Sequence, residues 1–92
     1  MPGQGASSPA ITVYTAPGCP DCAALKQWLT RNGHAYTEKD LSAPGMAEEA
    51  KRRYGIRVAP ITIIGTQVFY GMFTTQLPAI ERAGIRTNAP MN

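Results

Sequence analysis

Two cysteines three positions apart, in the run Cys19-Pro20-Asp21-Cys22, are the residues of this sequence best suited to chemistry. Side chains at positions i and i+3 of a helical turn lie on the same side, and a disulfide can bridge the distance between their Cα atoms. The pair can therefore alternate between a dithiol and a disulfide. We predict that the Cys19 thiolate attacks a substrate disulfide and that Cys22 resolves the mixed disulfide.

The positions of the two sulfurs relative to a helix predict these separate roles. Cys19 lies just ahead of a predicted helix, where unpaired backbone N–H groups and the helix dipole favour negative charge, so the pKa of its thiol is expected to fall toward neutrality. Cys22 lies one turn inside and is expected to be the less reactive thiol. Two neighbours tune the site. Pro20 suits the first helical turn, and the Asp21 carboxylate opposes the Cys19 thiolate while stabilising the helix start.

Two other uses of the cysteine pair stay open at this point. A zinc site usually needs four ligands, but His34 is the only histidine of the chain, so we assign no metal ligands. A purely structural disulfide between residues this close would close too small a loop to add much stability. Reversible thiol chemistry is the use that the spacing favours.

Composition limits the setting of this pair. A chain of 92 residues encloses one core, which we place at residues 10–85, between a flexible leader at 1–9 and a flexible tail at 86–92. The net charge of +3 is mild, and Lys51-Arg52-Arg53 is interpreted as a solvated helix face, not a nucleic-acid site. With no secretory signal and no run of 18 apolar residues, a cytoplasmic location without membrane or nucleic-acid partners is expected.

The elements that must position the cysteines follow from hydrophobic spacing and from turn residues. Runs of β-branched and aromatic residues predict strands, 3.6-residue spacing predicts helices, and glycine or proline marks the breaks. Predicted strands cover residues 11–15, 35–39, 61–64 and 67–70, and predicted helices cover 21–32, 46–54 and 76–83. The order is therefore βαβ, a helix, and then ββα.

Two of these elements carry more detailed predictions. The apolar run at residues 61–64 is typical of a strand buried on both faces. Thr74 and Thr75 are expected to cap the last helix, which directs Leu77 and Ile80 inward and is closed by Gly84.

Three parts of the sequence resemble the glutaredoxin family: the motif at residues 14–22 with its Cys-Pro-x-Cys pair, the run Val58-Ala59-Pro60, and Gly71. The resemblance covers about residues 10–84. It implies an α/β thioredoxin/glutaredoxin fold, in which a four-stranded mixed sheet is flanked by three helices. It also implies that the Ala59–Pro60 bond is cis, that Pro60 lies against the active cysteine, and that the Ala59 backbone pairs with the substrate chain.

Departures from the family pattern bear on the source of electrons. Glutathione-using members usually carry a basic residue three positions before the first cysteine and an acidic pair at the start of the last helix. This chain has Ala16 and the segment 70–75 at those places, although the helix start can still bind a carboxylate weakly. With Arg57 three positions before Pro60, the chain looks more like the NrdH-redoxins. Those proteins are reduced by thioredoxin reductase and donate electrons to class Ib ribonucleotide reductase.

Together these observations predict a monomeric dithiol oxidoreductase that acts on protein disulfides, with a redox-active disulfide and no bound cofactor. Tyr70 and Phe73 are expected to form an apolar rim for a protein partner, whereas Tyr14 and Phe69 are expected in the core. The candidate substrate contacts are Val58, Ala59, Pro60, Tyr70, Gly71, Phe73, Thr74 and Thr75. A glutathione-dependent glutaredoxin, and a module that binds zinc or an iron–sulfur cluster between two subunits, remain the alternatives.

Overall fold

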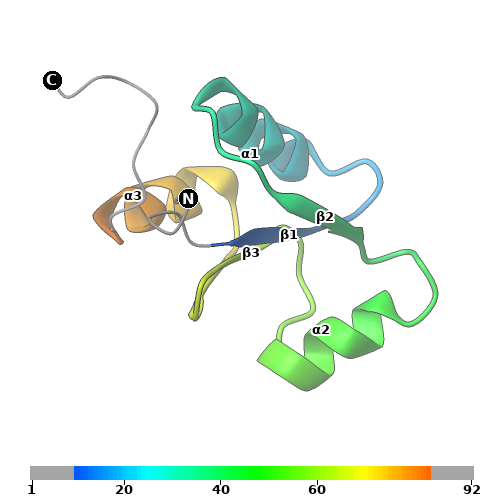
Figure 1. Ribbon diagram of the computed structural model, residues 1–92. Helices are drawn as coiled ribbons and strands as arrows, with labels where there is room; N and C mark the ends of the chain where they lie inside the picture. Colours follow the sequence, from blue (N-terminus) through cyan, green and yellow to red (C-terminus); the bar gives the residue numbers. More distant parts are fainter. Residues whose placement is uncertain (1–9, 84–92) are drawn as a thin grey trace, which may run out of the picture.

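The elements follow one another in the predicted order along residues 10–83, the part of the chain that the computed structural model describes (Figure 1). They are β1 (Ile11–Thr15), α1 (Pro20–Arg31), β2 (Thr37–Asp40), α2 (Met46–Tyr54), β3 (Ile61–Ile64), β4 (Gln67–Tyr70) and α3 (Phe73–Arg82). The predicted leader, the predicted tail and the helix stop at Gly84 lie outside the described residues.

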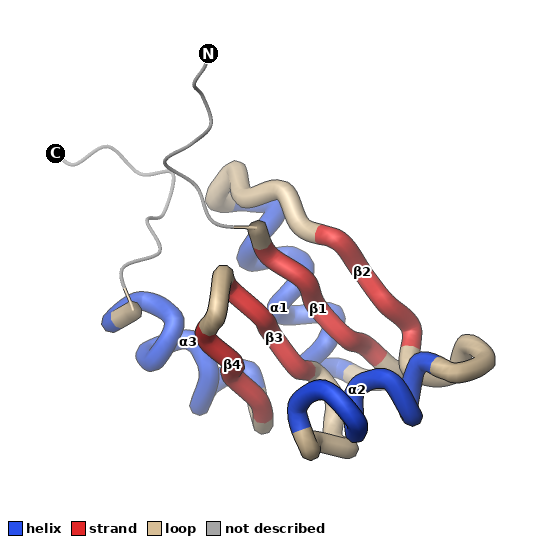
Figure 2. Tube along the Cα trace, turned by 60° about the horizontal axis from the view of Figure 1, so that its bottom comes forward, coloured by secondary structure: helices blue, strands red, loops and turns tan. Residues whose placement is uncertain are grey.

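The strands form one mixed sheet of four, in the order β2-β1-β3-β4 (Figure 2). β1 runs parallel to β2 and antiparallel to β3, which in turn pairs antiparallel with β4. The register places Thr15 opposite Asp40, and Ile61 opposite both Tyr14 and Tyr70. The end of β1, the start of β3 and the end of β4 therefore meet at one end of the sheet, and the loop to Cys19 leaves from there.

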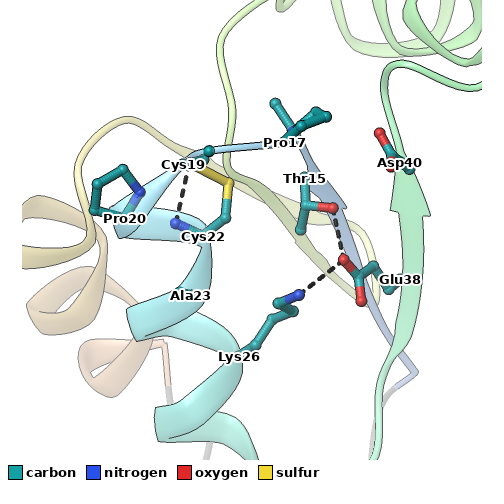
Figure 3. A pocket seen from close by; sticks show the side chains of 11 residues that line it. Thr15, Pro17, Cys19, Pro20, Cys22, Ala23, Lys26, Glu38 and Asp40 are labelled. Carbon is teal, nitrogen blue, oxygen red and sulfur yellow. Dashed lines mark hydrogen bonds and ion pairs between the residues drawn. A yellow bond between two sulfur atoms is a disulfide. The ribbon is translucent and has the colours of Figure 1, made fainter.

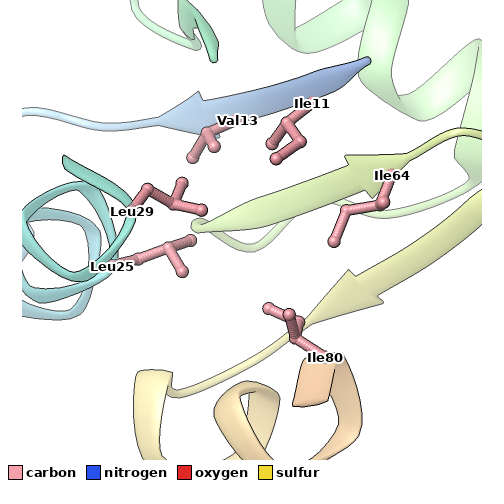
Figure 4. Close-up of a cluster of buried hydrophobic side chains, with 6 residues drawn as sticks. All are labelled: Ile11, Val13, Leu25, Leu29, Ile64 and Ile80. Carbon is pink, nitrogen blue, oxygen red and sulfur yellow. The ribbon is translucent and has the colours of Figure 1, made fainter. Parts of the chain in front are cut away.

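Helices cover both faces of this sheet: α1 and α3 lie on one face and α2 on the other (Figure 1). Because side chains alternate along a strand, each strand contributes to both interfaces. The first interface is a cluster of Ile11, Val13, Leu25, Leu29, Ile64 and Ile80 (Figure 4), and the second contains Tyr14, Ala50, Ile61 and Ile63. All four residues of β3 are buried, which confirms the prediction of a strand covered on both faces.

The main difference from the sequence prediction lies at the start of α3. The helix begins at Phe73, three residues before the predicted start at Gln76, and its N-cap residue is Met72. The prediction that Thr74 and Thr75 cap this helix is wrong, because both lie inside the first turn and no side chain of the N-cap residue caps it. β2 also begins at Thr37 and not at Ala35, because only its residues from Thr37 onward pair with β1.

Candidate active site

Cys19 and Cys22 form a disulfide in this structure, with their Cα atoms 5.2 Å apart, within the range that a disulfide bridges. Cys19 is the N-cap residue of α1, Pro20 occupies the first turn, and the backbone N–H of Cys22 donates a hydrogen bond of 3.1 Å to the Cys19 Sγ. Cys19 is half-buried, whereas Cys22 is only 2% exposed. An external sulfur can therefore approach Cys19 but not Cys22.

A groove of about 610 Å³ runs along one side of the disulfide (Figure 3). It lies between the loop after β1, the first turns of α1, and β2. Its charged members are Lys26, Glu38 and Asp40, and we call this surface the charged groove. The remaining lining residues are Thr15, Ala16, Pro17, Gly18, Cys19, Pro20, Cys22 and Ala23.

Glu38 organises the polar side chains of the charged groove. Its Oε2 accepts a hydrogen bond of 2.7 Å from the Thr15 hydroxyl and one of 3.0 Å from the Lys26 ammonium, and Figure 3 shows both side chains directed at it. These two donors lower the pKa of Glu38, and the hydrogen bond to Glu38 raises the pKa of Lys26. The hydroxyl and backbone N–H of Ser42 likewise lower the pKa of Asp40. At neutral pH the groove therefore presents two carboxylates and one cation that is already paired.

The other side of the site is built on Gln76, which the sequence analysis missed. Its side chain is 1% exposed, and its amide donates hydrogen bonds of 2.8 Å to the carbonyl oxygens of Pro60 and Gly71. Its Oε1 accepts a hydrogen bond of 2.7 Å from the buried Thr62 hydroxyl. Gln76 thus joins α3 to the residues before β3 and after β4. Gln76 lies four residues before the inward-facing Ile80, and this spacing places both on the same helix face, so the sequence could have indicated that Gln76 is buried.

Several predicted contact residues lie at these junctions. The Ala59–Pro60 peptide bond is cis, as the resemblance implies, and Pro60 is buried. Gly71 has a φ of 104°, a backbone conformation that side-chain-bearing residues rarely adopt. Gly71 follows Tyr70 directly, so this backbone conformation turns the chain from the end of β4 toward α3.

The surface around these junctions is apolar. Val58, Tyr70 and Met72 are 52%, 57% and 60% exposed, and we call these three residues the apolar flank. Val58 and Tyr70 were predicted contacts, whereas Met72 was not recognised from the sequence. Phe73 is half-buried and packs against the core cluster of α1 and α3, so it contributes less surface than predicted. The predicted core residues Tyr14 and Phe69 are buried and half-buried, respectively.

Asp21, predicted only to tune Cys19 and to stabilise α1, makes a contact with a different helix. Its Oδ1 accepts a hydrogen bond of 3.1 Å from the backbone N–H of Phe73, the first residue of α3. Arg57, by contrast, lines a separate cavity of about 340 Å³ beside α2 and not the charged groove. Asp21, one of the two residues between the cysteines, therefore links the redox pair to the start of α3.

The family model for glutaredoxin matches residues 11–69, a stretch that contains both cysteines and Pro60. The chain belongs to the glutaredoxin family. The solved structure of a glutaredoxin from Brucella melitensis is 35% identical, with a TM-score of 0.65 over 88% of this chain and 87% of that one. The chain is a thiol–disulfide oxidoreductase by this family membership and by its Cys19–Cys22 pair.

Two further solved structures confirm the thioredoxin/glutaredoxin fold. The glutaredoxin-like NrdH-redoxin of Escherichia coli is 28% identical, with a TM-score of 0.67 over 88% of this chain and 99% of that chain. A thioredoxin-like protein is 30% identical, with a TM-score of 0.68 over 78% of this chain and 96% of its own. No curated protein sequence matches the chain significantly.

Among residues 10–83 of this glutaredoxin-family chain, no three His, Cys, Asp or Glu side chains are grouped so that they could hold a metal ion. None of the helices within the same range is long and apolar enough to cross a membrane.

Proposed function

We propose that this glutaredoxin-family chain reduces protein disulfides with electrons from thioredoxin reductase, in the manner of the NrdH-redoxins. Among solved relatives, the Escherichia coli NrdH-redoxin is a glutaredoxin-like protein with a thioredoxin-like activity profile, and almost its whole length matches this chain. The disulfide of a ribonucleotide reductase is one candidate substrate. The observation that carries the choice of reductant is the charge of the groove beside Cys19.

In the proposed reaction the reduced chain acts through Cys19. The Cys19 thiolate attacks one sulfur of the substrate disulfide, a new S–S bond forms, and the other substrate sulfur leaves as a thiolate that takes up a proton. The Cys22 thiolate then attacks the Cys19 Sγ and releases the second substrate sulfur. The substrate has gained two electrons, and the chain is left with the Cys19–Cys22 disulfide present in this structure.

The surroundings of the two sulfurs support these roles. Cys19 is the more exposed sulfur and lies at the N-cap of α1, where the helix dipole and the Cys22 N–H stabilise a negative charge on its Sγ. Cys22 is buried one turn away, so it reaches Cys19 more easily than it reaches an external disulfide. Because the Cys22 thiol is held close to Cys19, attack by Cys22 on the mixed disulfide is faster than attack by a thiol from solution.

The charged groove supports a reductant other than glutathione. Glutathione carries two carboxylates and one ammonium group, so its net charge at neutral pH is negative. The groove offers one cation, Lys26, which is paired with Glu38, and it adds the carboxylate of Asp40, which accepts hydrogen bonds from Ser42 and not from a cation. Ala16, at the place where a basic residue would hold a glutathione carboxylate, lines the same groove without a charge. The groove is therefore a poor site for an anionic tripeptide.

The apolar flank supports a protein as the substrate. Exposed apolar side chains gain free energy when a partner covers them, and small redox proteins without a deep pocket must recognise substrates through such surfaces. We propose that Val58, Tyr70 and Met72 contact the partner, while Ala59 and Pro60 position its chain beside Cys19. Thr74 and Thr75 are exposed on the first turn of α3 and complete this proposed contact surface.

A glutathione-dependent reaction is the second candidate, because the Brucella melitensis relative is a glutaredoxin that is 35% identical to this chain. The two candidates differ in their reductant. The oxidised chain is mixed with NADPH and thioredoxin reductase in one reaction, and with NADPH, glutathione and glutathione reductase in another. Cys19→Ser protein is the blank.

We expect NADPH to be consumed with thioredoxin reductase and only slowly with glutathione. Consumption with glutathione alone would contradict the proposed reductant and support the second candidate. No consumption in either reaction, with protein that is shown to be folded and oxidised, would contradict disulfide reduction by this pair.

A further inference from the structure

The hydrogen bond between Asp21 and Phe73 joins the two parts of the site. Asp21 lies between the two cysteines in the first turn of α1, and its carboxylate accepts the N–H of the first residue of α3 at 3.1 Å. α3 has no other side-chain cap among its neighbours: Met72 makes no capping hydrogen bond, and the first turn contains no acidic residue. Within residues 10–83, the negative side chain at the start of this helix therefore comes from the redox segment.

This contact changes what the start of α3 can bind. The first N–H groups of a helix and its dipole attract anions, so the N-terminus of a ten-residue helix beside a reactive sulfur would favour negatively charged substrates. Here the carboxylate of Asp21 already takes the Phe73 N–H and supplies the compensating charge. An incoming carboxylate would have to displace Asp21 or to approach against its charge.

The side of the disulfide opposite α3 carries the same sign of charge. The charged groove holds Glu38 and Asp40 against the single cation Lys26. An anionic substrate therefore meets a carboxylate on either approach to Cys19. The two approaches differ in one respect: Asp40 lines the groove with its Oδ1 bonded to Ser42, whereas Asp21 is half-buried and occupies a helix start.

We propose that Asp21 is a specificity-determining residue that closes the N-terminus of α3 to negatively charged disulfides, so that Cys19 reacts preferentially with neutral or cationic ones. Asp21 acts through α3 and does not itself react, so it is a positioning residue. The proposal rests on the proposed disulfide reduction and explains part of its selectivity. It extends the role predicted from the sequence, which concerned only the charge beside Cys19.

The test compares two small disulfides that differ in charge. Reduced protein is mixed with hydroxyethyl disulfide, which is neutral, or with dithiodipropionate, which carries two carboxylates, and the second-order rate constant for oxidation of the protein is measured with each. The quantity of interest is the ratio of the anionic to the neutral rate constant. Any change in the thiolate fraction of Cys19 affects both rate constants equally and leaves this ratio unchanged.

The variants separate the effect of a carboxylate at the start of α3 from that of a carboxylate far from Cys19. Asp21→Ala opens the Phe73 N–H and removes the charge, and we expect the ratio to rise about fivefold, the equivalent of a typical charge at a helix N-terminus. Asp21→Asn keeps an oxygen that can accept the Phe73 N–H, so it protects the fold while it removes the charge, and a smaller rise is expected. Glu48→Ala removes an exposed carboxylate from α2, which lies on the other face of the sheet from α3, and is the matched control, with a change of less than about twofold expected from screened long-range charge alone.

The outcomes distinguish this proposal from the one it rests on. An unchanged ratio in both Asp21 variants, or an equal rise in Glu48→Ala, would overturn the role of Asp21 while disulfide reduction stands. If the unaltered reduced protein reacts with neither disulfide, the proposed function itself fails.

Discussion

The two sides of the Cys19–Cys22 disulfide are built from different chemistry. In the charged groove, the polar side chains are already satisfied by one another, with Thr15 and Lys26 both bonded to Glu38. On the apolar flank, Tyr70 and Met72 are more than half exposed and have no such partners to lose. Covering the groove would require ion pairs to be desolvated, whereas covering the flank buries apolar surface. The difference favours the proposal that a protein partner docks on the flank.

The flank also depends on a more rigid support than the groove does. Gln76 holds Pro60, Gly71 and Thr62 through three hydrogen bonds from one buried side chain. The groove network involves Lys26 and Glu38, whose side chains are 33% and 40% exposed. Water can replace the partners of an exposed side chain but not those of a buried one. Removing the hydrogen bonds of Gln76 should therefore lower the stability of the protein much more than removing those of Glu38.

The largest effect is expected from Gln76→Leu. Leucine fills the same space but leaves the Thr62 hydroxyl and two carbonyl oxygens without their partner, so the free energy of unfolding should fall by about 3 kcal/mol. Urea unfolding of the oxidised protein measures this change. Gln67→Leu is the matched control, because Gln67 is an exposed glutamine of β4. Equal stability losses in the two variants would contradict the supporting role of Gln76.

A moderate effect is expected from the double variant Tyr70→Ser, Met72→Ser. Loss of two apolar contacts should raise the KM for a protein disulfide about tenfold and leave the rate with hydroxyethyl disulfide unaltered. Val68→Ser is the control, since Val68 is an apolar residue of β4 that is 38% exposed and pairs with Ile63, away from the end of β4. The same rise in KM in the control would show that the flank has no special part in docking.

The smallest effect is expected in the charged groove. Because Thr15 and Lys26 lower the pKa of Glu38, the ionised carboxylate contributes stability above its unfolded pKa of about 4.3, and this stability is lost as the pH falls through the lower pKa of the folded state. Glu38→Gln should therefore unfold with a flatter dependence on pH below neutrality. The urea midpoints of unfolding, measured from pH 7 to pH 3, give this pH dependence. Glu81→Gln, in α3, is the control variant. A pH dependence identical to that of the unaltered protein would show that the Glu38 network contributes nothing.

Most of the fold could be predicted because its signals are local. The β-branched runs of β1 and β3, the break before Cys19 and the glycine after α2 each determine an element from a few neighbouring residues. The start of α3 could not be predicted in this way. Proline suits the first turn of a helix, and Thr74 and Thr75 precede Pro78, so the two threonines look like capping residues. The helix is capped instead by Asp21, which lies 52 residues from Phe73 in the sequence.

The candidate site divides along the same line. The cysteine pair, its place at a helix start and the cis Pro60 follow from motifs that are contiguous in sequence. The roles of Gln76, Glu38 and Asp21 depend on hydrogen bonds between separate elements, which packing determines and no short motif encodes. These were the residues that the sequence analysis missed or understood only in part.

The central claim is that Cys19 attacks and Cys22 resolves, and a trapping measurement tests it most directly. Reduced Cys22→Ser protein is mixed with a peptide disulfide, digested, and analysed by mass spectrometry. The serine oxygen cannot resolve the mixed disulfide, so we predict that a stable peptide adduct accumulates on Cys19, while Cys19→Ser protein treated in the same way forms little adduct on the buried Cys22. Equal or faster adduct formation on Cys22 would contradict the account.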